Sequence, residues 1–326
     1  MNNLLRLAQH IPVNPEVPVI SVHPVTLSAP NRGMDLEVRI SAPVEGDDLP
    51  VILLSHGHGP ALYIPSAQGY VPIASFWAAH GFVVIQPTHL NAKARGMDPE
   101  AAGGPTFWKS RVSDVRQIID ELGTVIDAVP GLAGRVNMAK IAVAGHSLGG
   151  QTAGVLLGAR VNDPNDPEGS NLDMSDPRIL AGVLLAAPGN GGGDLAEAIA
   201  SHPGFSFLSP DFGHMTTPTL VVTGDNDVNL RLTTRCPDWH ADPYHLSPRN
   251  KWLLTLSGGE HALGGISGFD AKETTDEDPD RLEAVCRMTW AWLRTAFDPS
   301  DRAWAEASRA LAGPASSLGN AVSKQA

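Results

Sequence analysis

The chain has 326 residues, of which 42% are hydrophobic and 18% are charged, and its formal net charge is −12. This composition is typical of a folded globular protein and unlike that of a disordered chain. The acidic balance argues against a nucleic-acid backbone or an anionic membrane surface as a partner. It leaves the oligomeric state open.

The sequence also bears on the cellular setting. No apolar run approaches the roughly 18–20 residues that cross a bilayer, so no membrane insertion is expected. The opening residues, MNNLLRLAQHIPVNPEVP, lack the basic, apolar and small-residue regions of a signal peptide, which favours a cytoplasmic protein. Cys236 and Cys286 are too few for a disulfide framework, and two buried free thiols are favoured over one bridge.

In chain order, an N-terminal arm over residues 1–17 precedes two strand-like segments, 19–29 and 34–44, which a turn joins into an antiparallel hairpin. From Pro50 onward, short apolar strands alternate with helices. Strands without internal alternation indicate a mostly parallel sheet flanked by helices on both faces, an α/β fold with about eight strands. The later strands are expected at 51–54, 82–85, 141–144, 179–188, 218–225 and 251–258, and the main helices at 71–80, 110–129 and 281–297.

A single folded domain over residues 18–298 is the simplest organisation. A polar insertion, 160–177, and an aromatic-containing loop, 235–248, interrupt the alternation of strands and helices. The Ala/Ser-rich residues 299–326 are expected to form one short helix and then a flexible tail.

The segment Gly145-His146-Ser147-Leu148-Gly149 lies where the strand 141–144 gives way to a helix. A serine on such a sharp turn projects from the sheet at the positive end of the helix, and small neighbours tolerate the strained backbone. A serine that only caps a helix would not account for both glycines. We therefore predict that Ser147 is a nucleophile.

A serine nucleophile needs a base, and an acid that orients the base, in the chain order Ser, Asp/Glu, His for this arrangement. His261 follows the strand 251–258 and is the best base among the 12 histidines. The alternative is a histidine of a surface loop. Asp225 and Asp227 lie at the end of the strand 218–225, and either is a candidate acid or an ordinary turn residue.

Charge that develops on a substrate carbonyl needs backbone N–H donors. One is the N–H of Leu148, directly after the nucleophile, and another is expected from the glycine-containing loop 56–60. His56 and His58 also form an H-x-H pair of the kind that metals use, but no acidic or cysteine partner is near in sequence. An oxyanion hole is therefore favoured over a metal site, and no metal or cofactor is expected.

Five motifs in order resemble the α/β-hydrolases, nearest in character to dienelactone-hydrolase-like and chlorophyllase-like esterases. They are LLSHGHG, AAHGFVVIQPTH, GHSLGGQTA, PTLVVTGDND and GGEHAL. The resemblance spans residues 50–297 and implies the α/β-hydrolase fold. It also implies an oxyanion-hole N–H from His58, and an acid at Asp227 rather than Asp225.

Two departures from these relatives narrow the expected substrate. Chlorophyllase-like enzymes often carry an acid after the next strand, where this chain has Ala187-Pro188, and this weakens chlorophyll as the substrate. Dienelactone hydrolases proper use a cysteine nucleophile, so the serine here favours general esters. The resemblance further implies that Arg111 and Asp114, on the helix before the nucleophile strand, are structural.

The resulting expectation is a serine carboxylic-ester hydrolase that acts on a small-molecule ester through an acyl-enzyme. An amidase, a thioesterase or a lactonase with the same triad is the alternative, and a non-catalytic binding protein of this fold is a further one. Tyr63, Trp239 and Tyr244 are candidate walls of the substrate pocket. Packing of these loop aromatics against the core is an equal alternative.

Overall fold

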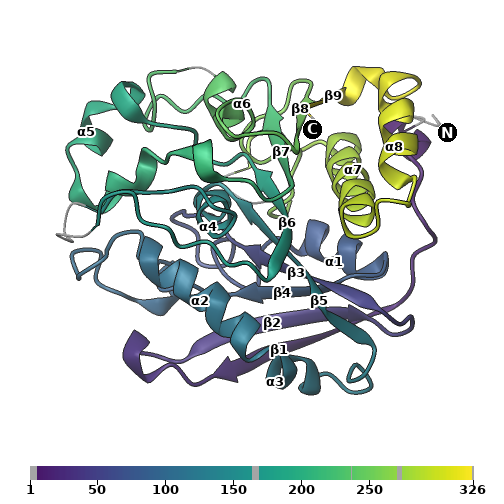
Figure 1. Cartoon of the computed structure of the whole chain (residues 1–326), viewed down its shortest axis with the longest axis horizontal. Helices are drawn as coiled ribbons and strands as arrows, with labels where there is room; N and C mark the ends of the chain where they lie inside the picture. Colours follow the sequence, from purple (N-terminus) through teal and green to yellow (C-terminus); the bar gives the residue numbers. More distant parts are fainter. Residues whose placement is uncertain (1–5, 164–168, 236, 270–273, 325–326) are drawn as a thin grey trace.

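A computed structural model describes residues 6–163, 169–235, 237–269 and 274–324. Within these residues, nine strands form one sheet in the order β1-β2-β4-β3-β5-β6-β7-β8-β9 (Figure 1). The mixed α/β fold and the mostly parallel sheet are confirmed, but the expected number of about eight strands is wrong by one. The strands are β1 (Val19–Leu27), β2 (Leu36–Pro43), β3 (Leu49–Ser55), β4 (Val83–Pro87), β5 (Val136–His146), β6 (Ile179–Leu185), β7 (Thr219–Gly224), β8 (Lys251–Leu256) and β9 (Gly319–Lys324).

The N-terminal hairpin is as predicted, since β1 and β2 pair antiparallel on either side of a 3-10 turn at Pro30–Arg32. β2 also pairs antiparallel with β4, and the strands from β4 to β8 pair in parallel. All the residues of β4 and β7 are buried. Side chains on both faces of these strands are therefore buried, and all but Gln86, Thr219 and Thr223 are apolar or glycine, which is why the sequence shows no alternation there.

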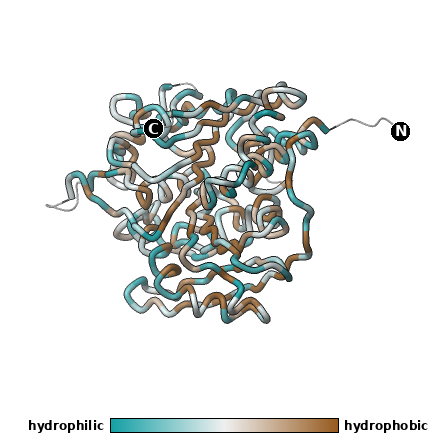
Figure 2. The backbone as a smooth tube through the Cα atoms, turned by 45° about the vertical axis from the view of Figure 1, so that its right-hand side comes forward, coloured by the Kyte–Doolittle hydropathy of each residue, from teal (hydrophilic) through white to brown (hydrophobic). Residues whose placement is uncertain are grey.

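Helices cover both faces of the sheet. In β3, Val51 and Leu53 pack in one core cluster with α2, α3 and α4, whereas Ile52 and Leu54 pack in the other with α1, α7 and α8. The hydrophobic segments accordingly run through the interior (Figure 2). No helix among the described residues is both long and apolar enough to cross a membrane. The helices are α1 (Val71–Ala79), α2 (Trp108–Asp120), α3 (Leu122–Asp127), α4 (Leu148–Leu156), α5 (Glu197–Ala200), α6 (Asp242–His245), α7 (Pro279–Phe297) and α8 (Ala303–Ala312).

The region expected as one helix over 110–129 is two helices. The break falls at Glu121, whose φ of −106° and ψ of 21° leave the helical region. The helical period continues across this break because both helices turn apolar residues toward the same core cluster. A regular hydrophobic pattern therefore does not reveal the interruption.

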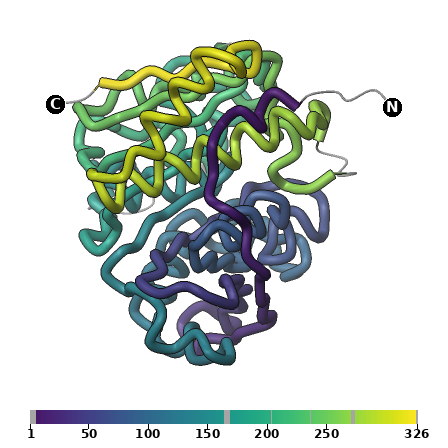
Figure 3. Tube along the Cα trace, turned by 90° about the vertical axis from the view of Figure 1, so that its right-hand side faces the viewer, coloured from purple at the N-terminus to yellow at the C-terminus, as the bar shows by residue number. Residues whose placement is uncertain are grey.

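Residues 7–11 of the N-terminal arm pack against α7 before the chain crosses away from it (Figure 3). The backbone N–H groups of Leu7 and Ala8 donate to the carboxylate of Asp280, at 2.9 and 2.8 Å. Arg287 on α7 donates to the carbonyl oxygen of Ile11 at 2.6 Å. These contacts hold the N-terminal arm against α7, a helix from the C-terminal part of the chain.

The C-terminal region differs from the expectation. The predicted short helix is present as α8, but the residues after it form β9, which pairs antiparallel with β8, and not a flexible tail. Without β9, the N–H and C=O groups on that side of β8 would be an open sheet edge. Pairing with these groups is the physical reason that a polar segment becomes a strand.

Three other predictions concern the polar insertion, the aromatic-containing loop and the cysteines. In the insertion 160–177, Arg160 forms an isolated antiparallel β-bridge with Asp211, and Val161 forms one with Leu172. Residues 164–168 of the insertion lie outside the described part of the chain. The loop 235–248 contains a 3-10 helix, Pro237–Ala241, followed by α6. Cys286 is a buried free thiol, as predicted, while Cys236 lies outside the described residues.

Candidate active site

Ser147 lies on the turn between β5 and α4, and its backbone has φ of 54° and ψ of −123°. Such a conformation is costly for a residue with a side chain and is found where the surrounding structure enforces it. The Ser147 side chain makes no capping hydrogen bond to α4, so helix capping does not account for the serine. It lies half-buried at the start of the helix, where the dipole favours negative charge.

The two glycines that flank Ser147 allow close backbone contacts. A Cβ atom at Gly145 would lie 2.0 Å from the carbonyl oxygen of Gly149, and one at Gly149 would lie 2.0 Å from that of Ser55 on β3. Neither neighbour is a flexible side chain that could move away. The glycines therefore let α4 pack closely enough on β3 to form the sharp turn.

Asp227 and His261 meet at the carboxyl ends of neighbouring strands. Asp227 follows β7, His261 follows β8, and His261 Nδ1 lies 2.9 Å from Asp227 Oδ2. Since a carboxylate only accepts, Nδ1–H is the donor, and Nε2 of the neutral ring is left as an acceptor. Asp225 instead accepts a hydrogen bond from the N–H of Gly258 at 2.6 Å, as an ordinary turn residue does.

The electrostatics of the pair suit a general base. Burial alone would lower the pKa of His261, but the hydrogen bond and the charge of Asp227 outweigh it and hold the pKa above the ordinary value. For Asp227, burial would raise the pKa, and the hydrogen bond and charge of His261 outweigh it, so the pKa is lowered. Asp227 is therefore ionised at neutral pH, and it stabilises the imidazolium form of His261.

Ser147 and His261 line the same cavity, which has a volume of about 50 Å³. His58 and Tyr70 also line it, and Ile64 belongs to its apolar wall. The predicted nucleophile and the predicted base thus line one cavity, although they lie 114 positions apart in the sequence.

The three predicted pocket aromatics do not line this cavity. Tyr63 is 68% exposed, and Trp239 is fully buried, with its indole N–H donating to the carbonyl oxygen of Asn190 at 2.9 Å. Tyr244 packs against the core cluster beside α4. Trp239 and Tyr244 therefore pack toward the core, which is the alternative given for these loop aromatics, and Tyr63 is exposed to solvent.

Of the two predicted oxyanion-hole donors, one lines this cavity and the other directly follows a residue that does. His58 lines it, and Leu148 is the first residue of α4, directly after Ser147. Among the described residues, neither backbone N–H donates to another protein atom. Neither amide is therefore engaged within the described part of the protein, as an oxyanion-hole donor requires.

The H-x-H pair is not arranged as a pair of metal ligands. Nδ1 of His56 donates to the carbonyl oxygen of Gly57 at 2.7 Å, and Nε2 accepts from the N–H of His89 at 3.1 Å. The His58 ring instead hydrogen-bonds to Asn91 at 3.1 Å. Each ring thus has its own partners.

A hydrogen-bonded chain that sequence reasoning missed connects the loop of Gly57 with the loop of His261. The N–H of Gly57 donates to the hydroxyl of Tyr70 at 3.0 Å, and that hydroxyl lies 2.7 Å from His146 Nδ1. His146 Nε2 lies 2.7 Å from the carbonyl oxygen of His261 and must donate to it, so Nδ1 accepts from Tyr70. Burial lowers the pKa of His146 to about 3, which keeps its ring neutral. Nothing in the sequence marks Tyr70.

Arg111 and Asp114 lie behind the site in a buried network. Arg111 donates to Thr152 and Asn91, and it also contacts the carbonyl oxygen of His56. Asp114 accepts from Arg32 at 2.7 Å and pairs with His89. Burial raises the pKa of Asp114 to about 6, although Arg32 opposes the rise.

The same network contains a second Ser–His–Asp alignment. Ser55 Oγ lies 2.9 Å from His89 Nε2, and His89 Nδ1 lies 2.8 Å from Asp114 Oδ2. All three residues are buried, with exposed fractions of 2% or less, and Arg111 donates to Ser55 Oγ at 3.0 Å. A substrate carbonyl does not reach this serine, so the alignment supports the loop after β3 rather than chemistry.

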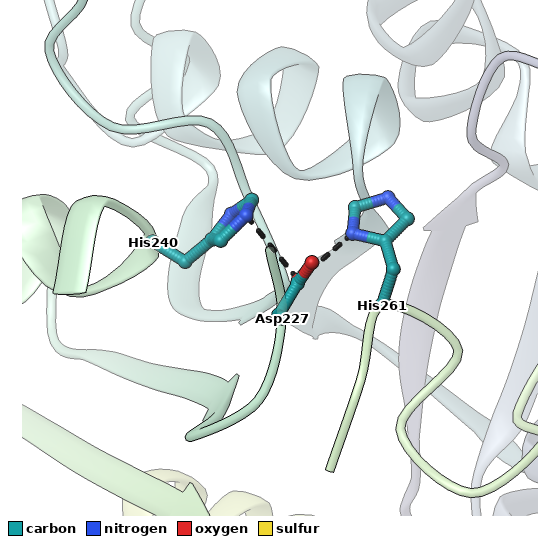
Figure 4. A group of neighbouring side chains, drawn as sticks. All are labelled: Asp227, His240 and His261. Atoms are coloured by element: carbon teal, nitrogen blue, oxygen red, sulfur yellow. Dashed lines mark hydrogen bonds and ion pairs between the residues drawn. The ribbon is translucent and has the colours of Figure 1, made fainter. Parts of the chain in front are cut away.

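His240 is a further neighbour of the acid that sequence reasoning missed. It comes from the 3-10 helix Pro237–Ala241, and its Nε2 lies 3.2 Å from Asp227 Oδ2, on the opposite side from His261 (Figure 4). Asp227, His240 and His261 are the group among the described residues whose ligand atoms are close enough for one metal ion.

The chain matches no protein-family model and no curated protein. Its fold and the geometry of the residues around Ser147 are what indicate its function.

Proposed function

We propose that the chain is a serine carboxylic-ester hydrolase with the α/β-hydrolase fold. The observation that carries the proposal is the His261–Asp227 hydrogen bond of 2.9 Å beside a cavity that Ser147 and His261 share. Three further features support it: the strained strand-to-helix turn at the serine, the mostly parallel sheet, and the chain order Ser, Asp, His.

In the first half of the reaction, His261 Nε2 takes the proton of the Ser147 hydroxyl as the oxygen attacks the ester carbonyl. The carbonyl oxygen becomes negatively charged and is held by the N–H groups of His58 and Leu148. Asp227 keeps the Nδ1 proton in place and stabilises the imidazolium. The tetrahedral intermediate collapses when His261 donates its proton to the alcohol oxygen, and an acyl-serine remains.

In the second half, a water molecule takes the place of the alcohol. His261 removes a proton from the water as it attacks the acyl carbonyl, and the same N–H groups hold the oxyanion. The carboxylic acid leaves, and Ser147 recovers its proton from His261. Each half-reaction returns the base to its starting state.

The cavity bears on the substrate. Its enclosed volume of about 50 Å³ is small compared with ligand pockets in general, and Ile64, Pro65 and Ala262 make part of its wall apolar. A short acyl group fits this description better than a long chain does. Amides, thioesters and lactones present the same carbonyl, so the leaving group is the variable that separates these alternatives.

The test combines turnover with labelling. We expect the purified chain to hydrolyse p-nitrophenyl acetate and butyrate faster than the palmitate ester, and a serine-directed phosphonate to label Ser147 and stop turnover. Ser147→Ala should lose both the turnover and the label. Ser267→Ala removes another serine of the same cavity and should still be labelled at Ser147. Absence of turnover across the ester panel, together with absence of a label on Ser147, would overturn the proposal.

A further inference from the structure

The buried His240 ring has one nitrogen in use and one without a partner. Nδ1 lies 2.8 Å from the carbonyl oxygen of Ala187, so it carries the hydrogen and donates. Nε2 is buried, and among the described residues it has no hydrogen-bond partner. Because His240 is only 1% exposed, bulk water does not satisfy this atom.

The atom that faces Nε2 is also an acceptor. Asp227 Oδ2 lies 3.2 Å away, but the approach does not meet the angle of a hydrogen bond. In the neutral ring, Nε2 presents a lone pair and no hydrogen. His240 Nε2 and Asp227 Oδ2 are therefore two acceptors close together with no hydrogen bond between them. A cation that both lone pairs reach would relieve this arrangement.

A third possible metal-ligand atom completes the group. His261 Nδ1 approaches Asp227 Oδ2 from the other side, and the three ligand atoms lie within 4.8 Å of one another (Figure 4). Two imidazole nitrogens and one carboxylate oxygen form a ligand set that suits zinc rather than magnesium or calcium. The Nδ1–H···O=C bond of His240 to Ala187 is the outer-shell contact that orients many metal-binding histidines.

We propose that Asp227, His240 and His261 form a binding site for an inhibitory zinc-class divalent cation. The ion takes Nε2 of His240, Oδ2 of Asp227 and Nδ1 of His261, and a water molecule fills a fourth position. The His261 ring keeps one proton, which moves from Nδ1 to Nε2 when the metal binds Nδ1. The ring then has no lone pair toward Ser147, so it no longer accepts the serine proton.

Binding of the ion requires one movement, an inward rotation of the His261 ring. A tetrahedral zinc ion with bonds of about 2.0–2.1 Å holds two ligand atoms about 3.3 Å apart, whereas the widest separation here reaches up to 4.8 Å. The His261 side chain is 34% exposed and the Asp227 side chain is 1% exposed, so the ring of His261 is the part that rotates inward. The exposed edge of the same ring is also the route of entry from the cavity.

Binding is tested on a chain that cannot turn over. Tag-free Ser147→Ala should bind one Zn²⁺ per chain in equilibrium dialysis at micromolar zinc, since Ser147 is not a ligand. Adding His240→Ala to this variant should weaken binding at least ~100-fold because a ligand is lost. His245→Ala is the matched control, an exposed histidine five residues away, and it should leave binding unchanged. Absence of zinc binding by Ser147→Ala, or equal binding by the His240 and His245 variants, overturns the site.

Two further measurements keep the test sharp. Co²⁺ should give the visible absorption of a four-coordinate ion with Ser147→Ala and not with the His240 variant, and His240→Gln replaces the alanine variant if that one does not fold.

The inhibitory role, unlike binding, rests on the proposed function: zinc should inhibit ester turnover with a midpoint equal to the dissociation constant, and a chelator should restore turnover. Zinc binding in a chain without turnover would keep the site and refute the esterase, whereas full turnover at saturating zinc would refute inhibition.

Discussion

His146 Nε2 donates to the backbone carbonyl oxygen of His261 across 2.7 Å, and the two rings lie 4.8 Å apart. The residue before the proposed nucleophile thereby holds the loop that carries the proposed base. Through Tyr70, the same ring is connected to Gly57 in the loop that carries His58, a proposed oxyanion donor. One neutral histidine therefore fixes three parts of the site relative to one another.

The hydroxyl of Tyr70 is the middle link of this chain, and its loss should affect both stability and activity. Tyr70→Phe leaves the buried N–H of Gly57 and Nδ1 of His146 without these partners, at a cost of about 1–3 kcal/mol for each orphaned group. We expect a lower free energy of unfolding in urea, and a kcat for p-nitrophenyl acetate at least tenfold lower with little change in KM.

Tyr63→Phe is the matched control because the Tyr63 side chain is 68% exposed in the neighbouring loop. It should behave as the wild type in both measurements. Equal stability and equal kcat for the two phenylalanine variants would show that the Tyr70 hydroxyl does not couple the loops.

The pH dependence of kcat/KM reports on His261. The base must be neutral to accept a proton, so kcat/KM should rise with pH through the His261 pKa, which Asp227 holds above 6.5. In Asp227→Asn the charge is lost and burial of the ring remains, so the inflection should move to lower pH while the plateau falls by orders of magnitude. Rate profiles between about pH 5 and 9 measure both effects.

Asp225→Asn removes the same charge two residues away, where the carboxylate accepts from the N–H of Gly258. Its inflection should stay in place. An inflection that stays in Asp227→Asn, or moves equally in both variants, would mean that Asp227 does not set the basicity of His261.

The parts of the site that the sequence predicts are those that local patterns encode. The β run before Ser147 and the small residues after it indicate the strand-to-helix turn, because backbone strain there restricts which neighbours fit. Asp227 and His261 can be proposed because each follows an apolar strand, and parallel strands end at one edge of the sheet. Resemblance, rather than spacing, favours Asp227 over Asp225, and the structure shows why in the hydrogen bond to Gly258.

The parts that the sequence does not predict depend on contacts between distant segments. β9 is a polar hexapeptide that becomes a strand because β8 offers an edge. His240 reaches Asp227 through a loop whose path no pattern fixes, and Trp239 beside it turns into the core. Such placements follow from packing of the whole chain, which overrides local composition.

Buried neutral histidines should make the fold sensitive to acid. The pKa of His146 is lowered to about 3 in the folded chain, mainly by burial, while the unfolded chain titrates near 6.5. Between these two pKa values, the His146 ring is protonated in the unfolded chain and neutral in the folded chain. The contribution of the neutral ring to the free energy of unfolding is therefore fully present above about pH 6.5 and is lost as the pH falls toward 3. His146 alone contributes up to about 1.4 kcal/mol per pH unit in this window.

Urea unfolding at several pH values between about 7 and 4 measures this slope. His56 and His89 add to it, because burial also lowers their pKa values well below the ordinary range. His146→Gln should reduce the slope by up to one proton, whereas His10→Gln, at an exposed position, should not. An unchanged slope in His146→Gln would mean that this ring titrates normally in the folded chain.

Two glycines of α4 should respond oppositely to the same substitution. A Cβ at Gly149 would lie 2.0 Å from the carbonyl oxygen of Ser55, in a central strand that has no room to shift, whereas a Cβ at Gly154 meets only Ala159 at 4.0 Å. Gly154→Ala should therefore raise the free energy of unfolding by up to about 1 kcal/mol, the difference in helix propensity. Gly149→Ala should lower it by several kcal/mol and abolish turnover, because α4 must move away from β3 and carry Ser147 with it. Thermal and urea unfolding compare the two, and soluble yield replaces them if Gly149→Ala does not purify folded. Equal stability of the two variants would contradict the close packing of α4 on β3 that positions Ser147, the proposed nucleophile.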